Sequence, residues 1–121
     1  MANKHKVRGI RGATTSADNI PEEIYIATRE LLTKMVDNNA VETADIAAVF
    51  FSATPDLDSA FPAKAAREIG WLKVPLFCHV EINVPDSISR CIRILMLVNT
   101  GLEQDQINHV YLKDTVRLRD I

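Results

Sequence analysis

The sequence predicts one α/β (α+β) domain spanning residues 1–121, with a mixed sheet and helices packed outside it. Short apolar runs typical of strands alternate along the chain with stretches whose apolar residues have helical spacing. A chain of 121 residues suits one domain and can bury one core. Neither a repeat nor a linker rich in proline or glycine divides it, and glycine occurs only four times.

The first half of the chain is expected to form a strand, a long helix and a second strand. Residues 7–13 form a short strand that contains two glycines. Asp18 or Asn19 can cap the helix that follows, and a proline suits its first turn. An apolar face continues to about Asn38, which indicates a long amphipathic helix. Residues 47–52 are almost wholly apolar, which predicts a buried strand.

The second half is expected to form a turn at residues 54–58, a short helix over residues 62–69 that Gly70 ends, and then strands. Those strands are predicted over residues 76–82, 91–98, 106–112 and 116–118. Two helices are too few to cover both faces of such a sheet. We therefore expect an oligomer, in which another subunit covers one sheet face.

Charge and hydropathy exclude several classes of protein. The net charge is −2 and the pI is about 5.9, so no basic field attracts nucleic acid. The longest apolar run, residues 46–51, is far too short to span a membrane, and the N-terminus lacks an apolar signal segment. Cys78 and Cys91 are 13 positions apart and form no disulfide framework. We expect a reduced, cytoplasmic protein.

Common nucleotide, esterase and metalloprotease motifs do not occur in the sequence. Gly9 and Gly12 have the wrong spacing for a phosphate-binding loop. His79 and Glu81 could share one strand face, with His109 elsewhere, but scattered histidines are usually structural or exposed. We therefore predict no metal site.

Two charged residues interrupt strands that are otherwise apolar. Arg93 lies in a run that is apolar on both faces, where a charge costs several kcal/mol unless it is paired. Its role can be a structural ion pair, an interface contact or ligand binding. Glu81 repeats the pattern in what we expect to be the neighbouring strand. The two residues can pair with each other or flank a polar ligand.

Further candidates also have structural interpretations. Arg11 can be an exposed cation on an edge strand, and Tyr111 a core residue. Lys64 and Arg67 share one helix face, as a solvated edge or as a rim that attracts anions. Cys78 is more often a core residue than a nucleophile. Together, these cations without a nucleophile or metal motif suit a small dianionic ligand and chemistry without covalent catalysis.

Four blocks of sequence, residues 7–15, 52–68, 91–94 and 105–112, resemble signatures of the AroH-type chorismate mutases. The blocks keep that family's order and nearly its spacing, and the match covers essentially the whole chain. The resemblance implies a homotrimeric pseudo-α/β-barrel with active sites between subunits. It also implies an isomerase of the shikimate pathway that converts chorismate to prephenate for tyrosine and phenylalanine synthesis, without cofactor or metal.

The resemblance also implies roles for individual residues. Arg93 and Glu81 are the implied catalytic residues. Residues 61, 64 and 67 would come from the adjacent subunit, and residue 119 from the C-terminal tail. The full implied substrate-binding set is Arg11, Phe61, Lys64, Arg67, Phe77, Cys78, His79, Val80, Glu81, Arg93, Tyr111 and Arg119.

The implied reaction is a Claisen rearrangement, in which an ether C–O bond breaks while a C–C bond forms. The ether oxygen becomes partly negative, and a fixed guanidinium such as Arg93 stabilises that charge. Arg11 and Tyr111 would hold carboxylates, and Glu81 would accept a hydrogen bond from the ring hydroxyl.

Two alternatives also explain the arginine. One is a non-catalytic trimer that senses carboxylate metabolites, and the other is a deaminase-like enzyme of a related trimeric fold. Neither explains the long blocks of similarity, and the fall in ultraviolet absorbance of added chorismate distinguishes all three.

Overall fold

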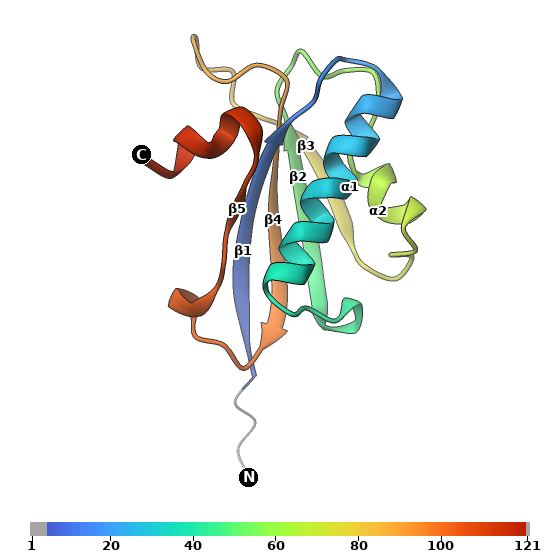
Figure 1. Ribbon diagram of the computed structural model, residues 1–121. Coiled ribbons are helices and arrows are strands. Elements are labelled where there is room, and N and C mark those ends of the chain that lie inside the picture. The colour runs from blue at the N-terminus through green and yellow to red at the C-terminus, as the bar shows by residue number, and fades with distance from the viewer. Residues whose placement is uncertain (1–4, 121) are drawn as a thin grey trace.

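The computed structural model describes residues 5–120, which form one mixed five-stranded sheet and two α-helices (Figure 1). The strands are β1 (Lys6–Thr15), β2 (Ile46–Ala53), β3 (Leu76–Val80), β4 (Cys91–Thr100) and β5 (Val110–Tyr111). The helices are α1 (Pro21–Asn38) and α2 (Ala63–Glu68), with short 3-10 segments η1 (Thr43–Asp45), η2 (Gln104–Gln106) and η3 (Lys113–Asp120).

The strand order is β3-β2-β4-β1-β5, with β4 in the middle. β4 runs antiparallel to both of its neighbours, β1 and β2. The two outer pairs, β1 with β5 and β2 with β3, are parallel. An irregularity between Ile46 and Ala48 of β2 shifts the register at the start of that strand only. The predicted fold class, a mixed sheet with helices outside it, is confirmed.

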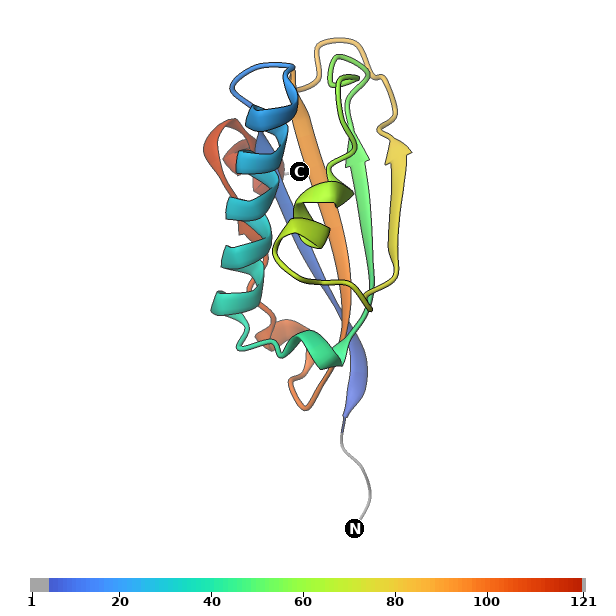
Figure 2. The same ribbon diagram turned by 90° about the vertical axis from the view of Figure 1, so that its right-hand side faces the viewer.

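Both helices pack on the same face of the sheet (Figure 2). In β4, Ile92, Ile94, Met96 and Val98 are buried under these helices, while alternate side chains point to the other face. Gly12 lets α1 approach β1 closely, because a Cβ atom there would overlap the sulfur of Met35. The sheet therefore has one covered face and one open face. None of the helices within residues 5–120 is long and apolar enough to cross a lipid bilayer.

The start of α1 differs from the prediction. Ile20 is the N-cap residue, and no side chain caps the helix. Asp18 instead accepts a hydrogen bond from the backbone N–H of Asn19. The Asn19 side chain donates to Asp58, 39 positions along the chain, so a loop contact replaces the expected cap.

The C-terminal strands are also shorter than predicted. The side chain of Gln104 forms a reciprocal pair of hydrogen bonds with the backbone of Gly9. Side chains thereby occupy part of the β1 edge, and only Val110–Tyr111 pairs with β1 as a strand. The predicted strand over residues 116–118 is wrong, because the chain turns at Lys113, whose φ is 55°, and enters η3.

Candidate active site

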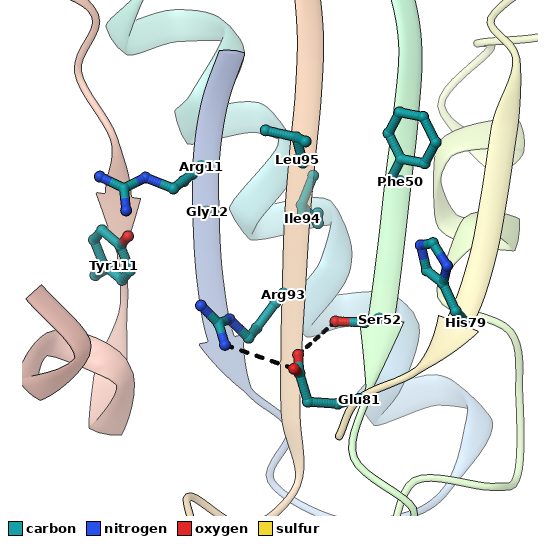
Figure 3. Close-up of a pocket in the computed structure, with 10 residues that line it drawn as sticks. All are labelled: Arg11, Gly12, Phe50, Ser52, His79, Glu81, Arg93, Ile94, Leu95 and Tyr111. Atoms are coloured by element: carbon teal, nitrogen blue, oxygen red, sulfur yellow. Dashed lines mark hydrogen bonds and ion pairs between the residues drawn. The ribbon is translucent and has the colours of Figure 1, made fainter. Parts of the chain in front are cut away.

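The open face of the sheet contains a cavity of about 510 Å³ to which every strand contributes (Figure 3). Its lining consists of Arg11, Gly12, Phe50, Ser52, His79, Glu81, Arg93, Ile94, Leu95 and Tyr111. Two arginines, a carboxylate and a phenol thus face one cavity whose exposed lining is mostly apolar. This arrangement suits a small ligand with negative charges and a hydroxyl group.

Strand register brings these side chains together. Ser52 of β2 lies opposite His79 of β3 and opposite Arg93 of β4. Arg93 lies opposite Ala13 of β1, which in turn pairs with Tyr111 of β5. Because paired strands lie about 4.8 Å apart, one row across the sheet spaces these groups at regular intervals.

Arg93 and Glu81 form the charged centre of the cavity. The distance from Arg93 Nη1 to Glu81 Oε1 is 3.6 Å. The other carboxylate oxygen, Oε2, accepts a hydrogen bond of 2.7 Å from Ser52 Oγ. Figure 3 shows the carboxylate lying between these two side chains.

The expectation of a buried Arg93 is wrong for this chain, since its side chain is 46% exposed. The strand is apolar on both faces because the open face itself includes Leu95 and Leu97, and Arg93 lies on that face. The expectation that the strands of Glu81 and Arg93 are neighbours is also wrong. β2 lies between them, and Ser52 of β2 bridges the gap.

Arg11 and Tyr111 lie side by side at the β5 side of the cavity (Figure 3). Arg11 is exposed, and its backbone N–H donates to Nδ1 of His109 at 2.9 Å. Tyr111 is half-buried on β5. The structure thus brings together Arg11, Tyr111, Glu81 and Arg93, which sequence reasoning proposed as one site.

Most of the other proposed residues line a second cavity of about 700 Å³, which includes Phe61, Lys64, Cys78, His79 and Val80. The Phe61 side chain is 75% exposed at this cavity. Lys64 Nζ lies 5.5 Å from the ring centroid of Tyr25. His79 lines both cavities, so the two cavities adjoin each other at β3.

Three proposed residues line neither cavity. Phe77 packs in an aromatic cluster, with its ring centroid 4.9 Å from that of His79. Arg67 is exposed on α2. Arg119 lies in η3, and its side chain is outside the described part of the chain.

The two cysteines are free and are unsuited to nucleophilic catalysis. Burial raises the pKa of the Cys78 thiol, although a hydrogen bond from the backbone of Ala63 partly opposes this. Burial raises the pKa of the Cys91 thiol to about 11. Both thiols are therefore protonated at neutral pH. Within residues 5–120, no three histidine, cysteine or acidic side chains gather to hold a metal ion.

Sequence reasoning missed Phe50 and Ser52 as cavity residues. Both lie on β2, and alternation along that strand places them on the open face together. The available signal was Ser52 itself, a polar residue near the end of an apolar run. The sequence alone does not show which face of β2 the helices cover, so it could not assign Ser52 to the cavity.

Comparison with known proteins decides between the functions considered from sequence. A family model described as chorismate mutase type I matches residues 7–120. The chain belongs to the chorismate mutase type I family. The identification from the four sequence blocks is confirmed, and with it the predicted chorismate mutase function and the isomerase class.

Relatives and a solved structure agree with this family. Chorismate mutase AroH from Thermus thermophilus is 54% identical over 114 residues, which are 93% of each chain. Chorismate mutase AroH from Bacillus subtilis (strain 168) is 47% identical over 114 residues, covering 93% of this chain and 90% of that protein. A chorismate mutase structure from Clostridium thermocellum has a TM-score of 0.87 and 48% identity, covering 88% of this chain and 96% of that one.

Proposed function

We propose that this chorismate mutase rearranges chorismate to prephenate in the open-face cavity, by electrostatic and conformational stabilisation of the transition state. The supporting observation is the guanidinium of Arg93, which lies in a mostly apolar cavity with the Glu81 carboxylate 3.6 Å away. An arginine so placed can face the ether oxygen as its negative charge develops. The rearrangement breaks a C–O bond and forms a C–C bond without moving a proton, so the chemical step needs no acid–base group.

The remaining groups of the cavity would bind and orient the substrate. Arg11 and Tyr111 lie side by side and would hold substrate carboxylates, with the arginine providing a planar pair of donors. Glu81 would accept a hydrogen bond from the ring hydroxyl. Holding the side chain of chorismate folded over its ring contributes the orientational part of the rate enhancement.

We further propose that each active site is completed by a neighbour in a homotrimer. Within one chain, Phe61 and Lys64 line a cavity different from that of Arg93. The open face also exposes Phe77 (59%) and Leu95 (39%), apolar surface that a neighbour would cover. In a cyclic trimer, unlike patches meet at each interface, so one subunit's second cavity would meet the next subunit's first. Arg67 and Arg119 would then lie at the mouth of the site.

Localisation in the cytoplasm is part of the proposal, because both cysteines are free thiols. Chorismate and prephenate would be the small-molecule partners.

Mixing of inactive subunits tests the shared site. One variant is Arg93→Ala, and the other combines Phe61→Ala, Lys64→Ala and Arg67→Ala. Each homotrimer should be nearly inactive. After the two are unfolded, mixed equally and refolded, random assembly should leave about a quarter of the sites with an intact set of residues. Heterotrimers that regain no activity would show that each subunit holds a complete site.

A further inference from the structure

We propose that Ser52 is a positioning residue that holds the Glu81 carboxylate in place and away from the Arg93 guanidinium. This inference rests on the proposed roles of Glu81 and Arg93. The family resemblance does not imply that Ser52 contacts the substrate. Ser52 nevertheless lies on β2, between the strand that leads to Glu81 and the strand that carries Arg93.

The geometry of the three side chains supports a positioning role. Ser52 Oγ donates to Glu81 Oε2 at 2.7 Å, which is a short hydrogen bond to a charged acceptor. The contact between Arg93 Nη1 and Glu81 Oε1, at 3.6 Å, is longer than a hydrogen bond. The carboxylate is therefore attached to Ser52 and only faces Arg93.

Little else fixes the Glu81 side chain. Glu81 follows the last residue of β3, and its backbone N–H donates to the carbonyl of Ala53. The next residues, 82–90, form no strand or helix. Within residues 5–120, Ser52 is the residue that donates a hydrogen bond to this carboxylate. Its hydroxyl therefore selects the direction in which the carboxylate points.

That direction matters for the chemistry at Arg93. A carboxylate released from Ser52 can rotate toward the guanidinium and form a close, two-point ion pair. Such a pair would neutralise the charge that Arg93 must direct at the ether oxygen. It would also remove Glu81 from the path of the ring hydroxyl. Ser52 keeps both groups available by engaging one carboxylate oxygen.

The test measures kcat and KM for chorismate in a double-mutant cycle. Ser52→Ala should lower kcat/KM by about tenfold, the loss expected for one hydrogen bond to a charged group. Ser52→Thr keeps the hydroxyl and should retain most of the activity. In a Glu81→Ala background, where no carboxylate remains to be held, Ser52→Ala should cause no further loss.

A matched control is Thr100→Val, which removes a half-buried hydroxyl at the far end of β4. That hydroxyl accepts from the backbone of Leu102 and does not contact Glu81. This variant should be as active as the unmodified enzyme, and thermal unfolding should show that all variants fold.

The outcomes separate the two levels of the proposal. If Glu81→Ala lowers activity but Ser52→Ala does not, the positioning role is overturned while the proposed role of Glu81 stands. If Ser52→Ala lowers kcat/KM by the same factor in the unmodified enzyme and in Glu81→Ala, Ser52 acts independently of Glu81 and the inference is wrong. If Glu81→Ala has no effect, the proposed catalytic role of Glu81 fails, and the inference fails with it.

Discussion

The imidazole of His109 accepts a hydrogen bond from the backbone N–H of Arg11, with 2.9 Å between the two nitrogens. The accepting atom is Nδ1 of the ring. Gly12 and Ala13 are the residues of β1 that pair with β5, and the His109 contact continues the bonding of this strand edge to Arg11. It thereby fixes the backbone from which the Arg11 side chain extends.

We predict that His109→Ala raises KM for chorismate by roughly fivefold, the scale of about one lost hydrogen bond, and changes kcat less. In the proposed function, Arg11 binds a substrate carboxylate and contributes similarly to the ground and transition states, so its misplacement should appear mainly in KM. Steady-state kinetics checks this. His109→Asn is the control, because its amide oxygen can replace Nδ1 as the acceptor. An unchanged KM in the alanine variant would show that other contacts position Arg11.

Arg93→Lys should lower kcat by about 10²-fold or more, the loss associated with removing one oxyanion donor. Lysine keeps the charge but loses the planar fork and displaces the donor. The control is Arg8→Lys, because Arg8 pairs with Glu103 at 3.1 Å and lies outside the cavity. A near-normal kcat in Arg93→Lys, measured from chorismate absorbance, would remove this residue from the mechanism.

Burial raises the pKa of the Cys91 thiol from 9.0 to about 11. The unfolded chain therefore loses this proton at lower pH than the folded chain does. The contribution of the protonated Cys91 thiol to the free energy of unfolding is fully present below about pH 9. It amounts to on the order of 2 kcal/mol and is lost as the pH rises toward 11. Urea unfolding at fixed protein concentration should show a steeper loss of stability over this range than in Cys91→Ala.

Cys78→Ala is the matched comparison for this experiment, because the Cys78 thiol is only half-buried. Its stability should follow the pH dependence of the unmodified protein more closely than Cys91→Ala does. Parallel curves for the unmodified protein and Cys91→Ala would show that the Cys91 thiol does not contribute.

Gly12→Ala should destabilise the fold by about 1–3 kcal/mol, the usual cost of overpacking. The added Cβ atom would overlap Met35 Sδ and lie 3.1 Å from Leu31 Cδ1. Gly101→Ala is the control, since a Cβ there would lie 3.8 Å from the nearest His5 atom. Thermal unfolding compares the two, and equal melting temperatures would mean that α1 moves away from β1 without cost.

Local patterns in the sequence were enough to predict α1, the strand cores and the mixed sheet. Their hydrophobic periodicity depends on neighbours within a few residues, which a sequence shows directly. The motif blocks identified the family, and the resemblance implied Arg11, Glu81, Arg93 and Tyr111 as site residues, which the structure collects around one cavity.

The parts that sequence reasoning missed depend on contacts between distant segments. The exposure of Arg93 depends on which face of β4 the helices cover, and both faces of that strand are apolar. The role of Ser52 depends on β2 lying between β3 and β4, which strand order alone determines. The short β5 results from the Gln104 and His109 side chains, which bond to β1 from about 95 positions away.

The register irregularity of β2 lies between Ile46 and Ala48, at the end of the strand away from Ser52. From Val49 to Ala53 the pairing with both neighbours is unbroken. Insertions or deletions in the connection at residues 83–89 would therefore leave the spacing of the cavity side chains unchanged. A slip of β2 by one residue would turn Ser52 toward the helices and place Phe51 in the cavity. The pairing of the central strands, and not the length of this one connection, therefore sets where the cavity side chains lie.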